Sequence, residues 1–81
     1  MYANPLPIPG TTPLLDAEVT PGITARALEI LKDQQWPMFS ATNVETIDGV
    51  DVVARVEWHP PEPSIDHWHR GVTFYKVTDE L

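Results

Sequence analysis

The sequence predicts an α+β protein in which one amphipathic helix packs on a three-stranded antiparallel meander, in the order α-β-β-β, with an N-terminal proline-rich extended arm. Three observations support this fold class: an apolar stripe over residues 21–35, an Asp48-Gly49 hairpin signal between two β-type runs, and a third β-type run over residues 71–77. We expect two parts, an arm over residues 1–20 and a single small α+β domain over residues 21–81.

The arm is predicted from three prolines, Pro5, Pro7 and Pro9, that alternate with Leu6 and Ile8. Each proline fixes φ near the polyproline II value and removes a backbone donor. Such a segment cannot join the interior of a sheet. We therefore expect it to lie extended on its own domain or on a neighbour, and self-assembly through the arm is one interpretation.

The helix is expected to begin with Thr20 as its N-cap and Pro21 at its first position. Pro37 requires it to stop at or before Trp36. Its apolar stripe, which we expect to face the sheet, consists of Ile23, Ala27, Leu28, Ile30 and Leu31.

The hairpin is expected to pair Ile47 with Val50, because an Asp-Gly loop favours a two-residue type I′ turn. Continuing this register over residues 39–58 gives two faces. The face that carries the pairs Phe39/Trp58, Ala41/Val56, Asn43/Ala54 and Glu45/Val52 becomes apolar toward one end, so we assign it to the helix. The opposite face, with Thr42 and Arg55 at its centre, is expected to be polar and open to water.

A third strand is expected over residues 71–77, after a proline loop that ends the second. Val72 and Phe74 would point to one face, and Thr73, Tyr75 and Val77 to the other.

Composition limits the function classes. The chain has 81 residues, no cysteine and a formal net charge of −7. The acidic balance argues against nucleic acid as a partner and favours a protein partner with a basic surface. The sequence shows neither a membrane-spanning apolar stretch nor a recognisable signal peptide. We expect a cytoplasmic protein or a virion component that does not act on membranes.

The stretch SIDHWHRG, residues 64–71, offers the clearest candidate chemistry. In an extended chain His67 and His69 project to the same side, about 6–7 Å apart at Cα, which suits a shared divalent transition metal. His59 or Glu62 would supply a further ligand. Metal binding is one alternative function, and no other cofactor is expected.

The leading interpretation of this stretch is a recognition surface, because tryptophan, tyrosine and arginine anchor many protein interfaces. The acidic hairpin residues Glu45, Asp48 and Asp51 could also contact a basic partner. The candidate partner-binding residues around the proline loop are Trp68, His67, His69, Arg70, Tyr75 and His59.

We expect no enzymatic activity, because the chain lacks cysteine and its two serines, Ser40 and Ser64, have no recognisable catalytic setting. The sequence favours a small acidic interaction domain of the inhibitor, immunity or accessory type found in bacteria and phages. The alternatives are a metal-binding protein and a structural subunit of a larger assembly, for example a phage particle, docked through the arm.

Overall fold

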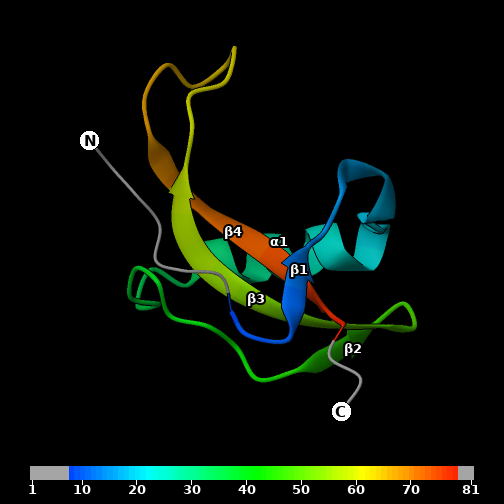
Figure 1. Ribbon diagram of the computed structural model, residues 1–81. Helices are drawn as coiled ribbons and strands as arrows, with labels where there is room; N and C mark the ends of the chain where they lie inside the picture. The colour runs from blue at the N-terminus through cyan, green and yellow to red at the C-terminus, as the bar shows by residue number, and fades with distance from the viewer. Residues whose placement is uncertain (1–7, 79–81) are drawn as a thin grey trace.

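The computed structural model describes residues 8–78. The predictions for Pro5, Leu6 and Pro7 therefore lie outside the described residues. Figure 1 shows one helix behind a curved sheet, and a β-hairpin that projects from the rest of the fold. The elements are β1 (Thr11–Pro13), a short 3-10 helix (Asp16–Glu18), α1 (Pro21–Lys32), β2 (Glu45–Ile47), β3 (Val50–His59) and β4 (His69–Val77).

The α+β class, with one helix and an antiparallel sheet, is confirmed. The sheet has four strands rather than three, in the order β1-β4-β3-β2, and each pairing is antiparallel. No helix in residues 8–78 is long and apolar enough to cross a membrane.

The fourth strand, β1, comes from the segment that was expected to be an arm. Thr11 lies opposite Val77 and Pro13 opposite Tyr75. Leu14 N–H donates to the Phe74 carbonyl at 3.0 Å, so by alternation the Pro13 nitrogen faces away from β4 and its missing N–H removes no ladder bond. Proline is therefore tolerated at this edge, and residues 11–13 form an edge strand instead of part of an extended arm.

The helix begins as predicted and is three residues shorter at its end than the predicted range 21–35. Thr20 Oγ1 accepts the Ile23 N–H at 3.2 Å, Pro21 is the first helical residue, and the helix ends at Lys32. Ile23 and Ile30 are buried, but Leu28 is 58% exposed, so its assignment to the buried stripe is wrong. At 3.6 residues per turn, Leu28 lies about 140° around the helix from Ile23, too far to reach the sheet.

The hairpin turn is also confirmed. Asp48 and Gly49 both have positive φ, 51° and 80°, as a type I′ turn requires, and Ile47 lies opposite Val50.

The predicted register is wrong beyond Glu45. Ala41 bridges to Arg55 instead of Val56, so three residues, 42–44, oppose only two on β3. Thr42 Oγ1 accepts the Ala54 N–H at 3.0 Å, in place of a regular ladder bond. Phe39, expected to pair with Trp58 on the helix side, has a φ of 70° and is 37% exposed.

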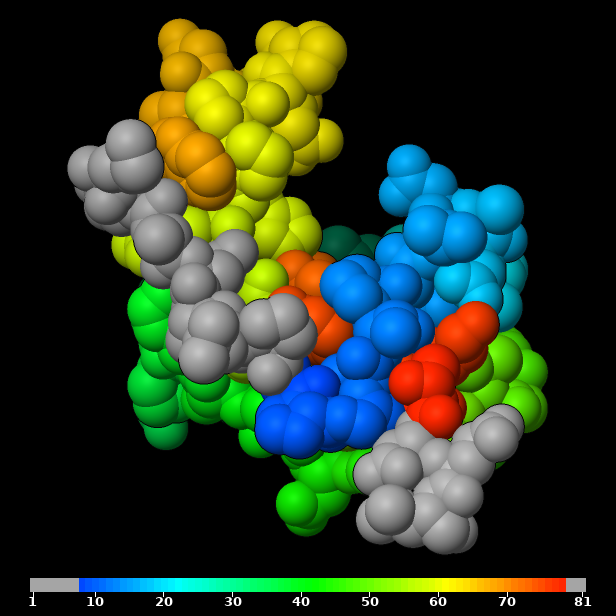
Figure 2. Space-filling view, viewed as in Figure 1, coloured from blue at the N-terminus to red at the C-terminus, as the bar shows by residue number. Residues whose placement is uncertain are grey.

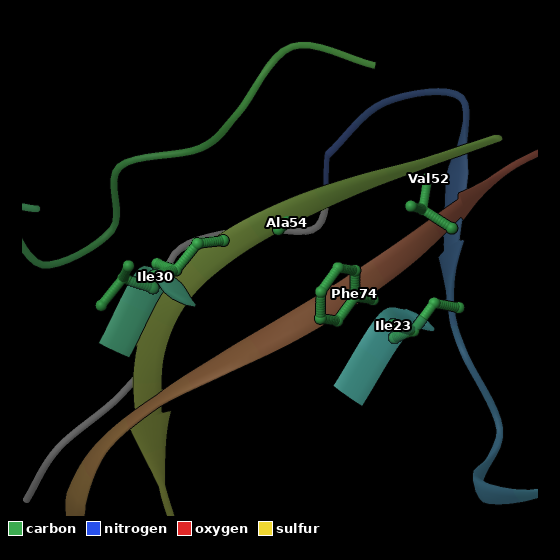
Figure 3. Close-up of a cluster of buried hydrophobic side chains, with 6 residues drawn as sticks. Ile23, Ile30, Val52, Ala54 and Phe74 are labelled. Atoms are coloured by element: carbon green, nitrogen blue, oxygen red, sulfur yellow. The ribbon is translucent and has the colours of Figure 1, made fainter. Parts of the chain in front are cut away.

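The core lies between α1 and one face of the sheet. In Figure 3, Ile23 and Ile30 extend from the helix toward Val52, Ala54 and Phe74 of the sheet. For β3, this face is the one predicted to meet the helix. Burial of these apolar side chains is the main source of stability in a fold of this size.

The opposite face of the sheet is not open to water as predicted, because Arg55 and Glu57 are 6% and 3% exposed. Arg55 Nε donates to Glu57 Oε2 at 2.6 Å, and Arg55 Nη2 donates to the Tyr75 hydroxyl at 3.0 Å. The Tyr75 hydroxyl in turn donates to Glu57. Burial, together with the bond to Glu57, raises the pKa of Tyr75 to about 12. Hydrogen bonding explains how these polar groups are accommodated in the interior.

Candidate functional site

The end of the β3–β4 hairpin brings His59 and His69 together. They are directly opposite in register, with ring centroids 6.0 Å apart. Glu62 approaches them from the loop, its Oε2 3.3 Å from His69 Nε2. A tight turn closes the loop, with mutual backbone bonds between Glu62 and Ile65. The sequence named these three side chains as candidates, but the register pairs His69 with His59 rather than with His67.

His67 lies in the loop before β4, with its side chain 72% exposed and Nδ1 3.4 Å from Asp66 Oδ1. Its carbonyl oxygen lies 3.2 Å from His69 Nδ1. Across residues 8–78, no group of three histidine or acidic side chains is arranged to hold a metal ion. The proposed metal pair, His67 and His69, remains a prediction.

The Arg70 side chain is bonded to the end of α1. Its guanidinium donates to three carbonyl oxygens at the end of α1 and just beyond it: Leu31 and Asp33, both at 3.3 Å, and Trp36 at 3.0 Å. The last carbonyls of a helix have no partner within the helix, and Arg70 supplies one from β4. Arg70 was predicted to contact a partner, whereas these bonds direct its guanidinium toward the chain's own helix.

Tyr75 does not flank the proline loop. It lies opposite Val53 in β3, is 5% exposed, and is bonded to Arg55 and Glu57. Its predicted place on the aromatic surface is therefore wrong. Trp68 does lie at the projecting end and is 39% exposed, so it retains the exposure that an interface residue needs.

The acidic hairpin residues are engaged within the chain. Arg26 binds Glu45 through two nitrogen–oxygen contacts of 3.1 and 3.0 Å. Asp48 accepts the Gly22 N–H, and Asp51 accepts the Thr46 hydroxyl at 2.6 Å. Each carboxylate thus has a partner from the same chain, which makes this turn a weaker candidate surface than the sequence suggested.

A cavity of about 270 Å³, which the sequence did not predict, opens beside β4. Figure 2 shows the hollow between the projecting hairpin and the segment that precedes α1. Its apolar lining is Leu14, Val19, Ile23, Ala27, Val72 and Phe74. Its polar lining is Asp16, Thr24, His59 and Thr73.

A hydrogen bond between two of its side chains fixes the polar part of the cavity. His59 Nε2 lies 2.9 Å from Thr73 Oγ1, a hydrogen bond across the two strands. The imidazole lies against Gly71, where an added Cβ would come within 2.7 Å of the ring, so glycine is needed there. Burial lowers the pKa of His59 below its ordinary value of 6.5, an effect that the nearby Glu57 opposes. At neutral pH the cavity therefore presents a neutral imidazole.

The wall formed by residues 14–19 is attached to the sheet by Glu18. Its carboxylate accepts hydrogen bonds from the Lys76 ammonium and, at 3.0 Å, from the Leu15 N–H. The bond from Lys76 and that from Leu15 lower the pKa of Glu18. These contacts hold Leu14 and Val19 at the mouth of the cavity.

Within the described part of the chain, the edge of β4 beside this cavity has no strand partner. Phe74 uses its carbonyl to bond Leu14, the last contact from the β1 side, and the chain then turns away toward α1. In a strand the backbone N–H and C=O groups of successive residues point to opposite sides. Val72, two residues before Phe74, therefore points its N–H and C=O to the same side as Phe74. Among residues 8–78 no chain segment pairs with it there. We call the cavity and this edge together the edge groove.

Comparison of the chain with protein-family models, with curated proteins and with solved structures finds no match.

Proposed function

We propose that this protein is a small, acidic, non-enzymatic interaction domain that binds a partner protein in the edge groove. The observation that supports this is the position of the cavity, which opens onto a part of β4 that no segment of residues 8–78 pairs with. An apolar cavity provides an anchor point, and a free strand edge provides donors and acceptors in a fixed direction.

The size of the cavity favours a side chain as its occupant. Pockets for cofactors and small-molecule substrates usually enclose about 300–1,000 Å³. At about 270 Å³ and open to solvent, this one suits one large or two small apolar side chains. The His59–Thr73 bond satisfies two polar groups within the wall, so an apolar occupant would leave neither unpaired.

The projecting hairpin would enlarge the contact surface. Trp68 and His67 lie at its exposed end, and we retain both as proposed partner contacts. The net charge of −7 favours a partner with a basic surface and speeds its association. Accessory, inhibitor and immunity proteins work in this way, by presenting a surface rather than by catalysis.

The test uses the full chain as bait in lysate of the cells that express it. Captured proteins are identified, purified and titrated into the ¹⁵N-labelled full chain. The proposal expects chemical-shift changes at Leu14, Ala27 and Val72, and loss of binding in the cavity-filling variant Ala27→Phe. Shift changes confined to other surfaces, or unchanged affinity in Ala27→Phe, would overturn it.

A matched control is Glu29→Lys, on the same helix. Glu29 is exposed and lies 3.7 Å from Arg26, on the side of α1 away from the cavity. The Glu29→Lys variant should bind the partner protein with wild-type affinity, apart from a general effect of its changed net charge. Thermal unfolding of Ala27→Phe separates blocked binding from loss of fold.

A further inference from the structure

We infer that the occupant of the edge groove is an extended segment of the partner protein, which adds to β4 as a strand and places one apolar side chain, flanked by lysine or arginine, in the cavity. This inference rests on the proposed function and specifies its binding mode.

Two independent sets of bonds show where the backbone of Val72 points. On one side, the Phe74 carbonyl is directed toward β1, and Val72 shares this orientation. On the other, Val56 bonds through its N–H to the Ser40 carbonyl at 2.9 Å and through its carbonyl to Phe39 N–H at 2.7 Å, both away from β4. Val56 and Val72 are register partners, so they face each other without a ladder bond. Val72 therefore offers its N–H and C=O outward.

An added strand has a defined register. A residue directly opposite Val72 exchanges both backbone bonds with it and projects its side chain to the same face as Val72. That is the face covered by α1, where Ala27 and Ile23 line the cavity. The same residue can thus pair with the edge and fill the cavity. A globular apolar ligand would fill the cavity without using the edge.

The charge around the groove favours a cationic segment. Asp16 is exposed and lines the cavity mouth. Glu62 stands nearby at the hairpin end, where its carboxylate contacts His69. Lysine or arginine beside the anchor can extend along the mouth of the groove, with its charged end toward these carboxylates. A second copy of this chain, at a net charge of −7, is a poorer occupant because like charges repel.

The test selects short random peptides by display on the full-length protein. The expected winners carry one leucine-, isoleucine- or phenylalanine-sized residue with lysine or arginine next to it, and no internal proline. The affinity of a synthetic version of a selected peptide is then compared with that of the same peptide N-methylated at the anchor residue. N-methylation keeps the anchor side chain and removes the donor to the Val72 carbonyl. Loss of one backbone bond should weaken binding about tenfold or more.

The charge component is tested with Asp16→Lys against Glu29→Lys, which change the net charge equally. We expect Asp16→Lys to weaken the winning peptide several-fold more than Glu29→Lys. Equal effects would overturn the charge component.

An unaffected N-methylated peptide would overturn strand addition while leaving the proposed groove intact. Peptides that bind Ala27→Phe as well as the wild type would overturn the groove itself. Concentration-dependent dimers lost in Ala27→Phe would instead identify a second copy as the occupant and overturn the inference.

Discussion

The backbone N–H of Gly22 donates a 3.1 Å hydrogen bond to Asp48 Oδ2, joining the first turn of α1 to the β2–β3 turn. A carboxylate at this end of a helix satisfies an orphan donor and interacts favourably with the helix dipole. A Cβ at position 22 would lie 2.5 Å from the same oxygen, so any larger residue would require the Asp48 carboxylate to move.

We predict that Gly22→Ala destabilises the protein, although alanine is intrinsically the better helix former by about 1 kcal/mol. The clash with Asp48 should reverse that preference and lower the free energy of unfolding by about 1 kcal/mol or more. Urea denaturation measures the change. In an Asp48→Gly background the same substitution should be less harmful, and equal losses in both backgrounds would contradict the explanation.

Tyr75 should resist alkaline titration. Because its pKa is raised to about 12, the folded protein holds the phenolic proton that an unfolded chain releases near 10. The stabilisation is present below pH 10 and is lost as pH rises toward 12. Tyrosinate absorbance in a Tyr2→Phe variant, where Tyr75 is the sole tyrosine, tests this directly. Ionisation near 10 in the folded protein would contradict the buried network.

Replacing Tyr75 by phenylalanine should lower the free energy of unfolding by about 1–3 kcal/mol, because Glu57 and Arg55 each lose a buried hydrogen-bond partner. Chemical denaturation measures this. Thr46→Val, which removes a hydroxyl bonded to Asp51 at the exposed hairpin, serves as the control and should have a smaller effect.

Arg70→Met should destabilise the end of α1. The change keeps the length of the aliphatic stem but removes the donors to the carbonyls of Leu31, Asp33 and Trp36. We expect a loss of about 1–3 kcal/mol in denaturant unfolding. Lys32→Met, an exposed cation in the same last turn, should change stability by less than about 0.5 kcal/mol. Equal effects of the two variants would mean that Arg70 contributes only charge.

Mild acid should weaken the fold through His59. Because burial lowers its pKa below 6.5, the unfolded chain takes up a proton more readily than the folded one. The contribution is fully present above pH 6.5 and is lost as pH falls through the lower, folded value. His59→Gln should flatten the decline of unfolding free energy below pH 6.5 relative to the wild type, and an unchanged decline would contradict the explanation. Glu18 titrates in a separate window, below 4.5.

Features specified within a few residues were predictable from the sequence. Thr20 and Pro21 start the helix, and Asp48-Gly49 requires a tight turn, because both depend on local backbone chemistry. Pairing between distant segments was not predictable in the same way. β1 joins β4 across more than 60 intervening residues, and Pro13 argues locally against a strand even though an edge tolerates it.

The register error has a similar origin, since the extra residue near Thr42 depends on a side-chain bond to Ala54 that periodicity does not encode. Arg55 and Glu57 alternate with apolar residues as a solvated face would, and only their mutual bonds and those to Tyr75 explain burial. At the site, the sequence identified His59, His67 and His69 as candidates, but not that the strand register places His59 opposite His69. The cavity could not be predicted, because it depends on where residues 14–19 lie against α1 and β4.

The open edge of β4 also bears on how the protein behaves at high concentration. Unpaired strand edges nucleate edge-to-edge aggregation, and soluble proteins commonly counter this with charge. In this protein, repulsion between the negatively charged molecules would oppose such aggregation, and this repulsion vanishes near the isoelectric point of about 4.6. Light scattering should therefore show a sharp solubility minimum there, and an edge-binding peptide should suppress it. The edge that we propose binds a partner at neutral pH would thus promote aggregation in acid.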